Sequence, residues 1–75
     1  MFRELDTVVL TRDVDEHGLK RGDVGAVVHC YPDGKAFEVE FVTAGGNTVA
    51  VLTLGAADIR LMAAAEILHA RQLAG

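Results

Sequence analysis

Few side chains in this sequence are of the types that carry out covalent or acid–base chemistry. The chain contains no serine and a single cysteine, Cys30, which directly follows His29. Because successive side chains of a strand point to opposite faces, this thiol and imidazole cannot act as a nucleophile and its base. Glu38 and Glu40 share one strand face about 7 Å apart, which imitates a paired-carboxylate site, although solvated carboxylates have the same spacing. We therefore expect no enzyme activity, and an enzyme centred on Cys30 or the two glutamates is the least favoured alternative.

Metal and cofactor sites are not indicated either. The three histidines, His17, His29 and His69, fall in separate segments, and no pair of cysteines accompanies them. Structural zinc sites need several such ligands at short spacings. The glycines between residues 18 and 25 lack the spacing of a phosphate-binding loop, and tight turns account for them better. We expect neither a metal nor a cofactor.

The length and charge of the chain limit its class. Its 75 residues form one domain, and 51% of them are hydrophobic, as the core of so small a domain requires. The net charge of −4 weighs against a general nucleic-acid binder, which neutralises phosphates with lysine and arginine. A single cysteine, a charged N-terminus and the lack of an apolar run near 18 residues predict a cytoplasmic protein with no signal peptide and no membrane span.

Five short segments have the composition of β-strands. They are rich in β-branched and aromatic residues and are separated by turns with glycine. The clearest segment alternates Phe37, Val39 and Phe41 with two glutamates, which predicts that the three large side chains point into the core. The predicted strands span residues 5–10, 24–31, 37–41, 48–54 and 59–61. This arrangement, with a long loop at 11–23, predicts a mainly β fold, a small five-stranded SH3-like barrel, with an OB-like barrel as the competing architecture.

The hairpin between the second and third predicted strands is compatible with two registers. If its loop holds residues 32–35, Cys30 lies opposite Phe37 and points inward, while His29 points outward beside Glu38. A shift of one residue turns His29 inward against Phe37 instead. We favour the first register because it places the apolar thiol in the core and the imidazole beside a carboxylate.

The end of the chain differs from the rest. Residues 62–74 contain neither glycine nor proline, and their alanines favour a helix that begins at about Ala63. Ala64, Ile67, Leu68 and Arg71 would form one stripe of this helix, which must dock because so short a helix is marginal in water. We therefore predict an SH3-like β-barrel at residues 1–62 and a C-terminal helical extension at residues 63–75. Docking on the barrel and pairing with another chain both remain open.

Several motifs resemble known small β proteins. The segment Gly22–Val28 resembles the entry into the second strand of SH3-like barrels, including the KOW motif of ribosomal and transcription-elongation proteins. Over about residues 2–62, the chain resembles an uncharacterised bacterial family of small proteins described as a domain of unknown function. The runs that carry this resemblance are Leu5–Asp13, Gly18–Gly25, Tyr31–Gly34 and Phe37–Phe41.

The resemblance implies an SH3-like barrel. It extends to the SH3-like ferredoxin-docking subunit of the photosynthetic NADH dehydrogenase-like complex and to the β-subunit barrel of nitrile hydratase. No catalytic residues come with this family.

These observations favour a non-catalytic protein-interaction module, such as an accessory subunit or an antitoxin-like partner of a neighbouring gene product. The residues expected to bind the partner are Asp13, Asp15, Glu16, Lys20, Arg21 and Tyr31. The alternative is a KOW-like nucleic-acid-binding protein that would use Arg12, Lys20, Arg21 and Arg60. The apolar run Val49–Leu52 also predicts a homo-oligomer, unless the C-terminal segment covers it.

Overall fold

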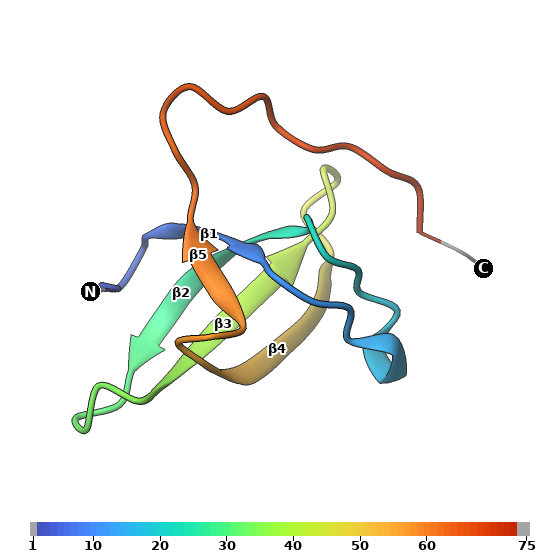
Figure 1. Cartoon of the computed structure of the whole chain (residues 1–75). Coiled ribbons are helices and arrows are strands. Elements are labelled where there is room, and N and C mark those ends of the chain that lie inside the picture. The colour runs from blue at the N-terminus through green and yellow to red at the C-terminus, as the bar shows by residue number, and fades with distance from the viewer. Residues whose placement is uncertain (1, 74–75) are drawn as a thin grey trace.

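A computed structural model describes residues 2–73 as a single antiparallel β-sheet (Figure 1). The spatial order of its strands is β4-β3-β2-β1-β5, so each of the first four strands lies beside its neighbour in sequence. The elements are β1 (Thr7–Leu10), a 3-10 helix η1 (Asp15–His17), β2 (Val24–Cys30), β3 (Ala36–Val42), β4 (Thr48–Gly55) and β5 (Ile59–Leu61). The prediction of a mainly β protein with five short strands is therefore confirmed.

One face of the sheet carries the hydrophobic core. Phe37, Val39 and Phe41 of β3 are at most 2% exposed, as their alternation with glutamates predicts. We call this side the core face. The opposite side, the outer face, carries the residues that alternate with them, including Glu38 and Glu40. The remaining buried apolar side chains of the core are Val8, Leu10, Val14, Leu19, Val27, Leu52, Leu54 and Ile59.

Gly25 in β2 allows the close packing of this core. A Cβ atom at this position would lie 2.8 Å from the Phe41 ring and 2.8 Å from a methyl group of Val39. Such distances are far below van der Waals contact, so only glycine fits opposite β3 here. Gly25, which follows the long loop, is therefore required by the close packing of β2 against β3 side chains.

The β2–β3 hairpin follows the favoured register at its end and departs from it further along. Cys30 pairs with Phe37, and His29 pairs with Glu38, as the first register predicts. That register also predicts Val28 opposite Val39, which is wrong because Val27 takes this position and a β-bulge follows it. Val27 and Cys30 both face the core side although they are three residues apart. Because side chains alternate, one extra residue must be accommodated between them, and Val28 is exposed.

The predicted barrel is wrong, because the sheet is open. β4 and β5 form its two edges, and β5 pairs only with β1 among the described residues. A barrel closes only when its first and last strands share a ladder. β5 has only three residues, pairs with β1 along one edge and forms no ladder with β4 along the other, although β4 and β5 are consecutive in sequence.

The predicted C-terminal helix at residues 63–75 is also wrong. Residues 62–73 form no helix, and Figure 1 shows them arching away from the sheet as an extended tail. A single turn forms, in which Glu66 N–H donates to the Ala63 carbonyl. Beyond it, the chain reaches Asp23 through Arg71. As a helix, the eight residue steps from Ala63 to Arg71 would span only about 12 Å, whereas as an extended chain they span roughly twice that distance. The extended form is what lets Arg71 reach Asp23. The last two residues of the predicted helix, 74 and 75, lie outside the described residues.

The predicted apolar stripe of the tail therefore does not pack. Ile67 is 94% exposed and Leu68 is 70% exposed. No helix within residues 2–73 is long and apolar enough to cross a membrane.

Candidate partner-binding surface

The loop between β1 and β2 is anchored on the core by two apolar side chains. Val14 and Leu19 are both buried, and their backbone groups form a small bridge, with Val14 N–H donating to the Leu19 carbonyl at 2.8 Å. η1 lies between them. Anchoring at these two points holds the charged residues of the loop on its solvent side.

Most of the charged residues predicted to bind a partner are satisfied within this loop. Lys20 Nζ lies 2.7 Å from Asp15 Oδ1, and the Asp13 carboxylate accepts the backbone N–H of Arg21 at 2.8 Å. Glu16 is exposed on η1. The structure thus brings together five of the six predicted residues, and it joins two of them, Asp15 and Lys20, in an ion pair. Exposed pairs of this kind contribute little to stability and offer less net charge to a partner.

Three of the four basic residues of the nucleic-acid alternative, Arg12, Lys20 and Arg60, are paired with carboxylates. Arg12 Nε lies 2.8 Å from Asp58 Oδ1, and this hydrogen bond lowers the pKa of Asp58. Arg60 forms a two-point contact with Glu66, with both distances at 2.7 Å. Together with the Ala63 N–H, Arg60 lowers the pKa of Glu66 to about 2. The partners of Lys20, Arg12 and Arg60 would have to be displaced before a phosphate could bind.

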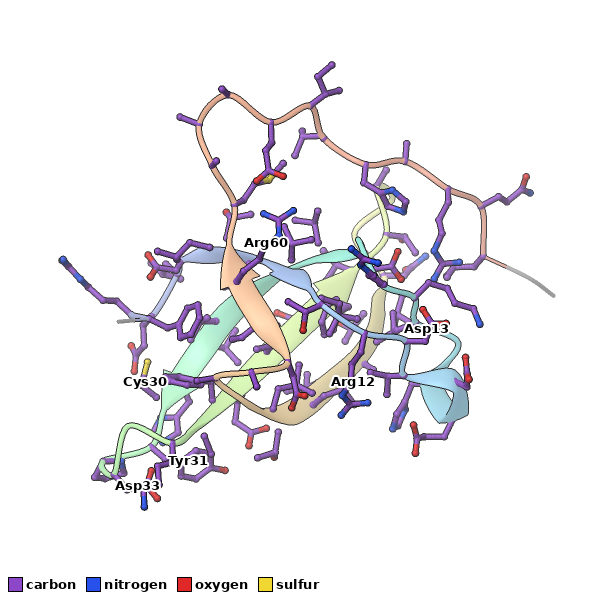
Figure 2. The ribbon with its side chains drawn as sticks, in the orientation of Figure 1. Arg12, Asp13, Cys30, Tyr31, Asp33 and Arg60 are labelled. Carbon is purple, nitrogen blue, oxygen red and sulfur yellow. The ribbon has the colours of Figure 1, made fainter. Side chains whose placement is uncertain are left out.

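Tyr31 lies apart from the loop. Figure 2 shows Tyr31 and Asp33 at the β2–β3 hairpin, at the opposite end of the molecule from Asp13. The phenol of Tyr31 donates a hydrogen bond to Glu38 at 2.6 Å. Its ring packs edge-to-face on the ring of His29, with centroids 4.9 Å apart. The six predicted binding residues therefore belong to two separate surfaces.

Four side chains on the outer face form one network, which we call the Tyr31 cluster: His29, Tyr31, Glu38 and Thr53. They come from β2, the residue that follows it, β3 and β4. Both Thr53 and Tyr31 donate hydroxyl hydrogen bonds to the same carboxylate oxygen of Glu38. These two bonds lower the pKa of Glu38, and the bond to Glu38 raises the pKa of Tyr31. The cluster thus holds a carboxylate in its charged form beside two aromatic rings.

Along β2, β3 and β4, the rest of the outer face is acidic and apolar. β2, β3 and β4 contain no lysine and no arginine. Glu40 accepts a hydrogen bond from Thr48 at 2.8 Å. Val28, Val42 and Val51 are exposed, at 40%, 52% and 50%. Isolated exposed valines are ordinary, but three on the strands that carry two carboxylates give a mixed surface of the kind found at interfaces.

The registers of the two hairpins predict most of this cluster. The hairpin register places His29 beside Glu38, and the next hairpin places Thr53 on the other side of Glu38. Combining the two registers would have brought three of the four side chains together. The hydrogen bond from Tyr31 back to Glu38 does not follow from these registers.

The edge formed by β4 is open along its length. Gly55 directs its N–H to the Asp58 carboxylate and its C=O to the Asp58 N–H, away from β3. Because this direction alternates along an antiparallel strand, Thr53 and Val51 also direct their backbone groups to the free side. Within residues 2–73, Thr48–Leu54 make no backbone hydrogen bond to any segment other than β3.

Asp23 fastens the tail to the end of the long loop. It is 8% exposed, accepts two hydrogen bonds from Arg71 and one from Lys20 N–H, and lies 3.2 Å from His69 Nε2. Burial raises the pKa of Asp23, but the bonds from Arg71 and Lys20 outweigh it and leave the pKa below its ordinary value. Because 48 residues separate Asp23 from Arg71, no local sequence pattern predicts this pair.

A cavity that is open to solvent lies between the tail and the sheet, next to the contact between Asp23 and Arg71. Its volume is about 780 Å³, and its lining includes Val24, Phe41, Val42 and Leu73. The tail therefore crosses one end of the outer face, near Glu40 and Val42, without filling the space beneath it.

The reactive side chains remain apart. Cys30 is partly buried against the core, where its Sγ donates to the Phe2 carbonyl at 3.6 Å, while His29 is on the outer face. Among the described residues, no three His, Cys, Asp or Glu side chains gather into a cluster that could hold a metal ion. What this surface offers a ligand is therefore hydrogen bonding, charge and apolar contact.

The fold and its surfaces define a small open-sheet β domain. A family model described as a domain of unknown function (DUF4926) matches residues 4–61, which include all five strands, and the chain belongs to this family. This confirms the expected membership of an uncharacterised family. No curated protein and no solved structure matches the chain, so the SH3-like resemblances gain no support.

Proposed function

We propose that this protein is a non-catalytic protein-interaction module, an accessory subunit or antitoxin-like partner, that binds another protein through the outer face around the Tyr31 cluster. The observation that carries the proposal is the cluster itself. Side chains from β2, β3 and β4 are ordered around the carboxylate of Glu38, and these three strands contain no lysine or arginine.

The order of these side chains favours binding. A tyrosine that is already held by a hydrogen bond and by ring contact loses little conformational freedom when a partner packs on it. Tyrosine presents a large apolar surface and a polar tip, which is why it is enriched at interfaces. Val28 and Val51 add apolar area beside it.

The charge of the face selects the partner. Glu38 and Glu40 are the only charged residues of β2–β4, and both are acidic. Together with the net charge of −4, they favour a partner segment that carries lysine or arginine. The association rate should therefore fall as salt is added.

The test compares two glutamates that undergo the same change of charge, the half-buried Glu38 and the exposed Glu16. A protein that copurifies with the wild-type chain is identified and its affinity measured for wild type, Glu38→Lys and Glu16→Lys. We expect Glu38→Lys to weaken binding at least tenfold and Glu16→Lys, on η1, to leave it within about twofold, since only Glu38 belongs to the proposed surface.

Three results would contradict the proposal. They are the absence of any protein partner, equal binding by the wild type and Glu38→Lys, and loss of binding only in Glu16→Lys. Tight binding of RNA or duplex DNA with a steep dependence on salt would support the nucleic-acid alternative instead.

A further inference from the structure

We propose that β4 pairs with β4 of a second copy of this chain, in antiparallel orientation, so that two sheets join into one across a two-fold axis. The inference is independent of the partner proposed for the Tyr31 cluster. It rests on the free backbone groups of β4, on their spacing and on the lack of charge along the strand.

The free groups determine one register. Val51 and Thr53 are the residues whose N–H and C=O face the open side, while those of Gly55 are bound to Asp58. If Val51 of one copy pairs with Thr53 of the other, each pair exchanges two hydrogen bonds and every free group of both residues is used. Leu52 then lies opposite Leu52 of the second copy, on the axis. If the axis passed through Val51, Val51 would pair with Val51 of the second copy and Thr53 would have no free partner. If it passed through Thr53, Val51 would face Gly55, whose backbone groups are already bound to Asp58.

The composition of β4 suits pairing with itself. Proteins protect exposed edge strands with lysine, proline, bulges or short length, because unprotected edges associate. β4 is the longest strand, with eight residues and neither a charge nor a proline. Its one irregularity lies at its beginning, opposite Phe41 and Val42. An uncharged strand meets its own copy without like-charge repulsion.

The other edge of the sheet does not share this property. β5 has three residues, of which Arg60 is one, and its pairing with a copy would bring two arginines together. Arg60 is also bound to Glu66 of the tail. Self-pairing is therefore specific to β4.

The side chains next to the new ladder are compatible with it. On the outer face, Val51 lies against Thr53 of the second copy, a pairing of two β-branched residues. On the core side, Ala50 of the second copy lies opposite Leu54. The long loop leaves a groove there of about 330 Å³, lined by Leu54 and the loop residues Arg12, Glu16 and His17. Ala50, which carries only a methyl group, is the side chain that this register brings next to the groove.

The dimer would enlarge the proposed binding surface. Antiparallel strands in one sheet are related by an axis perpendicular to the sheet, so the outer faces of both copies point the same way. Thr53 of each Tyr31 cluster lies at the junction. Two clusters would then face a partner on one continuous surface.

Sedimentation equilibrium and amide hydrogen exchange test the proposal together. A ladder of two residue pairs is small, so we expect weak association, with the mass rising from 8.0 kDa towards twice that value between about 10 µM and 1 mM. In the dimer, the amides of Val51 and Thr53 should exchange at least tenfold more slowly than in the monomer.

Two lysine variants with matched exposure locate the interface. Val51 and Val42 are 50% and 52% exposed on the same face, but only Val51 lies on the edge. Val51→Lys should raise the dissociation constant of the dimer at least tenfold, and Val42→Lys should leave it within about twofold. If Val51→Lys does not fold, Val51→Pro serves instead, because it removes a free N–H without touching the ladder to β3.

A wild-type chain that stays at 8.0 kDa over the whole range would overturn the proposal. So would a dimer in which the Val51 and Thr53 amides exchange as fast as in the monomer, because that dimer would use another surface. Neither result would affect the binding of a partner at the Tyr31 cluster, which Glu38→Lys tests separately.

Discussion

The sheet and the tail are both rich in apolar residues, but only the sheet buries them. The core side chains of β3 are at most 2% exposed, whereas Ile67 in the tail is 94% exposed. The buried apolar residues of the sheet meet partners on neighbouring strands, such as Phe37 opposite Leu54. The tail crosses open space and is tied down by polar contacts at Asp23 and Arg60. Apolar content thus becomes a core only where backbone pairing brings the side chains together.

This difference directs attention to the sheet as the source of function. Its core face is occupied, so the groups available to a partner are those of the outer face and of the β4 edge. The following predictions test the contrast between sheet and tail, beginning with the largest expected effect.

Phe37→Ala should destabilise the sheet most. Phe37 is 1% exposed and packs edge-to-face on Phe2, with ring centroids 5.0 Å apart. Removing a buried phenylalanine ring costs about 3–5 kcal/mol, through lost contacts and the cavity left behind. Because that is a large part of the stability of so small a domain, urea denaturation should show a largely unfolded chain. A loss below about 1 kcal/mol would mean that Phe37 is not central to the core.

Asp23→Asn should destabilise the tail contact by less. We expect a loss of about 1 kcal/mol near neutral pH, after allowing for solvent screening of Arg71. The pKa of Asp23 is lowered in the folded protein, so its contribution is present above the ordinary pKa of 3.8. It is lost as the pH falls through the lower folded value.

The free energy of unfolding, measured by urea between pH 7 and pH 2, checks this sign. The gap between wild type and Asp23→Asn should close as the solution becomes acidic. The control is Asp33→Asn in the exposed hairpin turn, which should change little. A gap that widens towards low pH would show that the carboxylate of Asp23 destabilises the fold.

Ile67→Ala should have the smallest effect. The side chain is almost fully exposed, so its removal should change the free energy of unfolding by no more than about 0.5 kcal/mol. Thermal or urea unfolding measures this directly. If the variant loses more than about 1 kcal/mol, the tail docks through its apolar side chains after all, and the contrast with the sheet fails.

The strands were predictable from sequence because their signals are local. Alternation of Phe37, Val39 and Phe41 with glutamates defines both the strand and its buried face. Cross-strand chemistry correctly favoured Cys30 opposite Phe37. The bulge after Val27 was not predictable, because it depends on how two strands fit the same core and not on either strand alone.

The errors concern features that depend on distant contacts. The alanines of the tail favour a helix locally, but a short helix is marginal, and Arg71 finds Asp23 instead. Whether five strands close into a barrel depends on the length and pairing of β5, which its composition does not reveal. The candidate site was predicted in part. Tyr31 lies on the proposed surface, whereas the charged residues of the loop lie on a separate one, with Asp15 and Lys20 paired to each other.

Hydrogen exchange of the chain with and without its captured partner tests the central claim most directly. The account predicts slower exchange on binding in residues 28–31, around Glu38 and around Thr53, with the tail at 63–73 unchanged. Slower exchange confined to the tail or to the loop at 11–23 would contradict it, because the partner would then bind away from the outer face of the sheet.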